Sequence, residues 1–120
     1  MEIRDESVEA LLPLPPVTFH ILMALADHDR HGYAIIREVA ERTGGDVKIG
    51  AGTLYRSIQR MLEQGLIVET GERPAPEIDD ERRRYYRIAP FGVEVAKAEA
   101  KRLSQMIELA RISGFAPGRA

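Results

Sequence analysis

Two groups of arginines have the side-chain chemistry and the spacing to bind a phosphate-rich partner. Arg56 and Arg60 lie four residues apart with Gln59 beside them, and a second group, the consecutive arginines 82–84, is followed by Arg87. A guanidinium group forms paired hydrogen bonds with phosphate oxygens, and it can also pair with the edge of a guanine base. Both groups therefore make nucleic acid the first candidate for a partner.

Other chemistry is poorly represented in the chain. The segment DHDRH contains four residues of types that can bind a metal, Asp27, His28, Asp29 and His31. Three ligands from only five consecutive residues would not easily surround one ion. A polar loop in which His31 begins the next helix is the preferred interpretation. The chain has no cysteine, which excludes disulfides, thiol catalysis and cysteine-ligated metals. Because no phosphate-binding glycine loop or informative nucleophile–base pair is present, we expect neither an enzyme nor a bound metal or cofactor.

The charge balance is compatible with a nucleic-acid partner. The chain carries 19 acids, 17 bases and a net charge of −2, which taken alone argues against such a partner. Four of the acids and only one base fall in the first ten residues, which leaves 15 acids and 16 bases in the rest. Local potential rather than net charge steers a polyanion onto a surface, so the arginine groups outweigh the total.

Length and composition indicate one soluble domain. The chain has 120 residues, of which 44% are hydrophobic and 30% charged, and these values are ordinary for a globular protein. No apolar run approaches the roughly 20 residues that span a bilayer, and the start lacks the basic and apolar segments of a secretory signal. We therefore expect a cytoplasmic protein that does not contact a membrane.

Hydrophobic periodicity predicts four helices. An acidic, flexible N-terminal arm is expected over residues 1–13 and a disordered tail over residues 114–120. The helices are predicted at about residues 17–28, 32–42, 53–64 and 90–113. The third carries the apolar stripe Leu54, Ile58, Met61 and Leu62 on one face and polar residues on the opposite face.

Two β-prone segments separate the third helix from the fourth. LIVET, residues 66–70, and RRRYYRI, residues 82–88, predict a hairpin with a long exposed loop between its strands. Alternation along the second strand places Arg83, Tyr85 and Arg87 on one face and Tyr86 with Ile88 on the other. We therefore expect Tyr86 in the core and Tyr85 on the exposed side.

Three compact helices closed by a hairpin form a winged helix, which is an elaboration of the helix-turn-helix. We predict a mainly α fold with a small β-hairpin. A winged helix-turn-helix domain would span residues 14–89 and a long C-terminal helix residues 90–113. In such folds the polar face of the third helix enters the DNA major groove, and the hairpin, called the wing, reaches phosphates or the minor groove.

Three motifs resemble the PadR family of transcriptional regulators. They are HGYAIIREV, GTLYRSIQRMLEQGLI and RRRYYRIAPFG, in the expected order, and the resemblance covers about residues 14–112. It implies a winged-helix DNA-binding domain and a dimerising C-terminal helix. It also implies a repressor that a small aromatic or drug-like effector releases from DNA. The single C-terminal helix is similar to that of the family's short subgroup.

The resemblance and the residue chemistry together name a set of DNA-binding candidates. Thr53, Leu54 and Tyr55 match the family's Thr-Leu-Tyr at the start of the recognition helix, and Arg56 stands where many members have proline. The residues that we expect to contact double-stranded DNA are Thr53, Tyr55, Arg56, Gln59, Arg60, Arg82, Arg83 and Tyr85.

The last predicted helix is expected to pair with a second copy of the chain. Its apolar arc is too broad to be buried on one small domain, and burial is favourable at about 25 cal/mol per Å². A homodimer would bind an inverted-repeat operator. An effector cavity between the first and last helices of the dimer would be lined by Phe19, Met23, Met106 and Leu109. The alternative hypothesis is a winged-helix module that binds another protein through the same faces.

Overall fold

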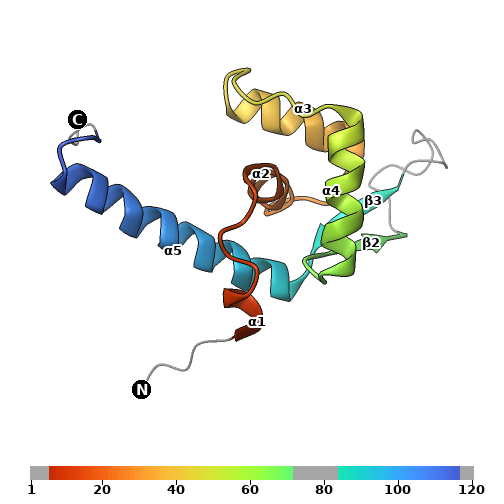
Figure 1. Ribbon diagram of the computed structural model, residues 1–120. Helices are drawn as coiled ribbons and strands as arrows, with labels where there is room; N and C mark the ends of the chain where they lie inside the picture. Colours follow the sequence, from red (N-terminus) through yellow and green to blue (C-terminus); the bar gives the residue numbers. More distant parts are fainter. Residues whose placement is uncertain (1–5, 72–83, 117–120) are drawn as a thin grey trace.

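The computed structural model describes residues 6–71 and 84–116. Its elements are α1 Glu6–Glu9, α2 Pro16–Ala24, β1 Arg30–His31, α3 Gly32–Arg42, α4 Ala51–Glu63, β2 Ile67–Thr70, β3 Tyr85–Ile88 and α5 Pro90–Ile112. In Figure 1, α2 lies between α3 and α5, α4 stands beside β2 and β3, and α5 runs away from the other elements. The three predicted helices, the two hairpin strands and the long helix occur in the predicted order, and α1 and β1 are additional elements.

The core lies where α2, α3, α4 and the start of α5 meet. Leu54, Ile58 and Met61 of α4 are buried as their spacing predicts, whereas Leu62 is only partly buried. The other fully buried large side chains are Ile21, Leu22, Ile35, Val39, Leu66, Ile67 and Val95. Burial of this stripe orients α4, because it forces the helix to present its remaining residues to solvent.

The end of α2 differs from the prediction of a helix reaching residue 28. Two guanidinium groups take its last carbonyls: Arg42 donates to the oxygen of Met23 and Arg30 to that of Ala24, each at 2.8 Å. These side-chain donors satisfy carbonyls that helical N–H groups would otherwise have to reach. The helix can therefore end at Ala24 without leaving its terminus unpaired.

The sheet has three antiparallel strands in the order β1-β3-β2, so the predicted hairpin is only part of it. Arg30 pairs with Tyr86 and His31 with Tyr85. The prediction that Tyr85 lies on an exposed face is wrong, because both tyrosines are buried. The rings of His31 and Tyr85 meet edge to face, with centroids 5.3 Å apart.

The N-terminal arm is a second correction. Residues 6–9 form α1, which packs against α5, and Val8 is buried in the core cluster. Leu11 and Leu12 pack on the same cluster. Apolar side chains at these positions anchor the segment, so the flexible arm predicted over residues 1–13 does not hold for its second half. Residues 1–5 lie outside the described residues.

The C-terminal helix ends close to its predicted boundary. Gly114 takes a φ of 82°, and the N–H of Phe115 donates to the oxygen of Ala110 at 2.9 Å. This left-handed turn is a common helix end, so the predicted disordered tail begins as a hydrogen-bonded turn. Residues 117–120 lie outside the described residues. Over the described ranges, no helix combines the length and apolar character needed to cross a membrane.

Candidate nucleic-acid interface

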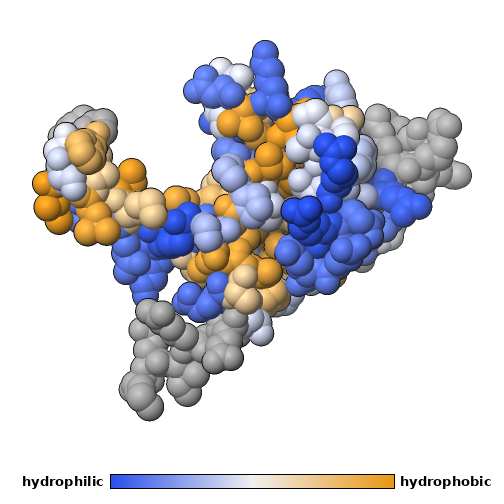
Figure 2. All heavy atoms as spheres, viewed as in Figure 1, coloured by the Kyte–Doolittle hydropathy of each residue, from blue (hydrophilic) through white to orange (hydrophobic). Residues whose placement is uncertain are grey.

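The exposed face of α4 carries all five residues predicted there. Thr53, Tyr55, Arg56, Gln59 and Arg60 are each exposed, and α4 begins at Ala51, two residues before the predicted start. The buried stripe occupies the opposite side of the same helix. In Figure 2, hydrophilic side chains cover the α4 side of the molecule. The helix therefore offers a convex polar surface, the shape that fits a major groove.

The arginines of this face carry charge that no described acid neutralises. Arg56 donates to the hydroxyl of Thr53 at 3.4 Å, and Gln59 donates to Glu63 at 3.2 Å. Arg60 makes neither a hydrogen bond nor an ion pair with any residue that the structure describes. Guanidinium groups without acidic partners are available to an anionic ligand without first breaking an ion pair.

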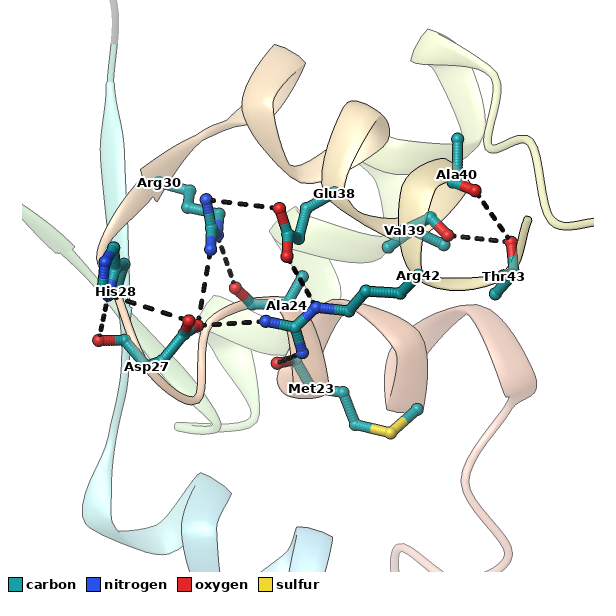
Figure 3. A network of polar contacts seen from close by, with 10 residues as sticks. All are labelled: Met23, Ala24, Asp27, His28, Arg30, Glu38, Val39, Ala40, Arg42 and Thr43. Carbon is teal, nitrogen blue, oxygen red and sulfur yellow. Dashed lines mark hydrogen bonds and ion pairs between the residues drawn. The ribbon is translucent and has the colours of Figure 1, made fainter. Parts of the chain in front are cut away.

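By contrast, the arginines at the junction of α2 and α3 are neutralised by acids. Arg42 lies 2.7 Å from Glu38 and 3.2 Å from Asp27. Figure 3 shows its guanidinium group pointing toward both carboxylates. Arg30 lies 3.4 Å from Asp27 and 3.6 Å from Glu38. The hydrogen bond with Glu38 raises the pKa of Arg42 above its usual value. Together with the carbonyl contacts of both arginines, this network holds α3 against the end of α2.

Asp27 and His31 both interact with other residues of the chain. Loss of solvation alone would raise the pKa of Asp27, but the hydrogen bond from its own backbone and the nearby charges of Arg30, His28 and Arg42 outweigh this effect and hold the pKa below its usual value. His31 accepts the N–H of Ala34 on Nδ1 at 3.2 Å and so caps α3 as expected. In the described parts of the chain, no three potential metal ligands come together.

The wing is described only in part. Arg82 and Arg83, two of the predicted DNA contacts, lie outside the described residues. Tyr85 is buried, so it supports the sheet and does not present a face to a ligand. Arg84 lies 3.6 Å from Glu69 on the neighbouring strand, and Arg87 pairs with Asp29 at 2.8 Å.

Tyr55 joins two of the sequence motifs in space. A Cβ atom at Gly32 would lie 2.6 Å from the hydroxyl oxygen of Tyr55 and 3.1 Å from Cδ2 of Leu54. The first turn of α3 therefore packs directly on the first turns of α4. The role of Gly32 was not predicted from the sequence, although a glycine at the start of a predicted helix is a signal of close approach by a neighbouring element.

The four predicted effector residues do not line one pocket within a single chain. Phe19 packs partly buried against the core, and Met23 is exposed near the end of α2. Met106 and Leu109 are exposed on the far half of α5, which runs away from α2 in Figure 1. Hydrophobic side chains gather over that half of α5 in Figure 2. The exposed apolar residues there are Met106, Ile107, Leu109, Ile112 and Phe115.

Three helices around one core, a small antiparallel sheet beside the third helix of the core, and a long terminal helix define a winged helix-turn-helix protein. The chain belongs to the transcriptional regulator PadR-like family, whose model matches residues 21–98. The resemblance deduced from the three motifs is thereby confirmed.

Two further proteins are similar to this chain, one in sequence and one in fold. A Lysinibacillus sphaericus protein named "Uncharacterized protein X" is 32% identical over 89 residues, which cover 74% of this chain and 79% of that one. The chain is also similar in fold to a transcriptional regulator from Clostridium thermocellum, Cth-833, with a TM-score of 0.69 and 24% identity. That match covers 97% of this chain and all of the other.

Two structures of PadR proteins share the fold at lower identity. A PadR family transcription regulator from Clostridium difficile R20291 has a TM-score of 0.70 and 22% identity, over 81% of this chain and 96% of that one. Bacillus subtilis PadR, solved in complex with operator DNA, has a TM-score of 0.60 and 15% identity. The match covers 70% of this chain but only 46% of that protein.

Proposed function

We propose that this protein is a homodimeric, sequence-specific DNA-binding regulator, and that it represses transcription until a small-molecule effector releases it. The observation that carries the proposal is the exposed face of α4, where Arg56 and Arg60 stand without acidic partners among the described residues. Family membership and the operator complex of Bacillus subtilis PadR, a protein of the same fold, support it.

Each residue of the α4 face has a separate role in this proposal. Thr53 and Tyr55, in the first turns of the helix, would donate to phosphates and set the position of the protein on the duplex. Arg56, Gln59 and Arg60 would read base edges in the major groove. Arg82 and Arg83 of the wing would bind phosphates beside it.

Dimerisation would pair the far halves of two α5 helices. Leu109 and Ile112 are 65% and 76% exposed, and residues of this size rarely remain so exposed together on a monomer. Two α4 helices would then enter successive major grooves about 34 Å apart, so the operator would be an inverted repeat. An effector would bind where α2 of one subunit meets α5 of the other, near Phe19, Met23, Met106 and Leu109.

The proposal can be tested by fluorescence anisotropy on DNA from upstream of the protein's own gene. A scrambled duplex of the same composition is the control, and both are titrated at two salt concentrations. We expect a preference for the upstream duplex, a stoichiometry of two chains per duplex and weaker binding at higher salt. An absence of binding to either duplex at low salt would contradict the proposal and favour a protein-binding module.

A further inference from the structure

The arginines on the two sides of α3 differ in whether acidic side chains neutralise their charge. On one flank Arg42 is held by Glu38 and Asp27, as described above. On the other flank the guanidinium carbon of Arg37 lies over the ring of Tyr33, 5.7 Å from its centroid. Although Glu41 follows Arg37 by four residues, Arg37 forms no ion pair with it or with any other acid that the structure describes.

This second flank adjoins the exposed face of α4. Tyr33 follows Gly32, the residue on which the Tyr55 hydroxyl packs. Both tyrosines are exposed, by 60% at Tyr33 and 52% at Tyr55. The Tyr33–Arg37 pair therefore begins one residue from the contact between α3 and the first turns of α4.

We propose that Arg37, oriented by Tyr33, forms a phosphate-binding subsite on α3 that contacts the DNA backbone beside the groove entered by α4. The inference rests on the proposed function and adds a contact that it does not contain. A guanidinium group that stacks on an aromatic face keeps the N–H groups of its edge free for phosphate oxygens. The ring also restricts the rotamers of the long side chain, so less freedom is lost when the contact forms.

The chemistry of the pair predicts a sequence-independent contact. A phosphate is the same at every position of a duplex, so Arg37 would strengthen binding to specific and scrambled DNA alike. The Tyr33 hydroxyl is a second donor of the same subsite, since tyrosine is among the side chains that bond phosphate oxygens.

The test compares Arg37→Gln with the unaltered protein in the anisotropy assay, between 50 and 200 mM salt. A homodimer carries Arg37 twice, so the variant loses two phosphate contacts per duplex and its salt slope falls by about 1.8, which makes the rise in Kd between the two salt concentrations about 12-fold smaller. Lys97→Gln is the matched control and leaves the slope unchanged, because it removes the same charge from an exposed position of α5 that has no ion pair with the described residues. Tyr33→Leu reduces affinity for both duplexes, while Tyr33→Phe, which keeps the aromatic ring, retains more of it than leucine does.

The outcomes separate this inference from the function on which it rests. If the unaltered protein does not bind DNA, the proposed function itself fails. If it binds and Arg37→Gln has the same salt slope, the subsite is refuted while the regulator remains. A change confined to the preference between the two duplexes would also refute it, because that result would make Arg37 a base contact. Circular dichroism melting of each variant shows whether the fold is intact.

Discussion

The guanidinium of Arg87 on β3 donates to both carboxylate oxygens of Asp29, with its Nη2 at 2.8 Å and its Nε at 3.2 Å. The two residues are 58 positions apart in the chain. Asp29 directly precedes β1, and Arg87 follows Tyr86, the partner of Arg30 in the sheet. This bidentate pair therefore fixes the connection between α2 and β1 on the strand that leads out of the wing.

A double-mutant cycle of Asp29→Asn and Arg87→Gln should measure the strength of this ion pair. Both side chains are partly exposed, so we expect a coupling of about 0.5–1 kcal/mol in the free energy of urea unfolding. The cycle subtracts whatever else either residue contributes alone. The coupling should shrink in 1 M salt, since exposed charges are screened. A coupling that does not respond to salt would show that the pair is not chiefly electrostatic.

Gly92→Ala should be strongly destabilising. A Cβ atom at this position would overlap the backbone carbonyl oxygen of Leu66, which also accepts the N–H of Ala89 at 3.0 Å. Backbone cannot rotate away as a side chain can, so the free energy of unfolding should fall by about 1–3 kcal/mol or more.

The matched control is Gly52→Ala, on an exposed turn of α4. There a Cβ atom would meet only the flexible guanidinium of Arg56, at 3.3 Å. Its stability should be unchanged or raised by about 0.5 kcal/mol, because alanine favours helix over glycine. Equal effects of the two substitutions in urea unfolding would contradict the packing at Gly92.

Tyr86 should make the protein sensitive to alkaline pH. Its burial, followed by the negative charge of Glu69, raises the pKa of the phenol above the usual value of 10.0. The folded protein therefore holds this proton more tightly than the unfolded chain does. Its contribution to stability is complete below about pH 10 and is lost as the pH rises further. Tyr86→Phe should flatten the fall in unfolding free energy between about pH 9 and 11, and an unchanged profile would count against the assignment.

Arg60→Ala should reduce the preference for the operator without altering the fold. Loss of a bidentate base contact costs about 1–3 kcal/mol of discrimination, so the ratio of Kd for scrambled and operator DNA should fall roughly 5- to 150-fold for each of the two half-sites. Binding to scrambled DNA should change much less. Equal losses on both duplexes would show that Arg60 contacts phosphate and not a base.

Replacement of Leu109 and Ile112 by glutamine should shift the protein toward monomers. Both side chains are exposed in the single chain, and their burial between two α5 helices would be lost. Sedimentation velocity over a range of concentrations measures the change. Val68→Gln is the control, since Val68 is also an exposed apolar residue but lies on β2. If the double variant remains as dimeric as the unaltered protein, α5 is not the interface.

Regular periodicity allowed much of this fold to be predicted. The spacing of Leu54, Ile58 and Met61 alone indicates which side of α4 is buried and therefore which side bears Arg56 and Arg60. Such a pattern is a local property, because a helix repeats every 3.6 residues whatever surrounds it. The last helix, predicted at about residues 90–113, agrees closely with the Pro90–Ile112 of α5.

Features that depend on contacts between residues far apart in the sequence could not be predicted from such patterns. A strand of two residues shows no periodicity, so β1 could not be predicted. The burial of Tyr85, which pairs with His31 of β1, likewise depends on the folding of the chain back onto β3. Likewise, the presence of an arginine in the sequence does not show whether an acid lies beside it in the folded protein. Arg42 meets Asp27 across a helix junction, whereas Arg37 meets only the ring of Tyr33 among the described residues. The type of each side chain follows from the sequence alone. Whether an acid neutralises an arginine depends on the distance between the two groups, and only the packing of the helices sets that distance.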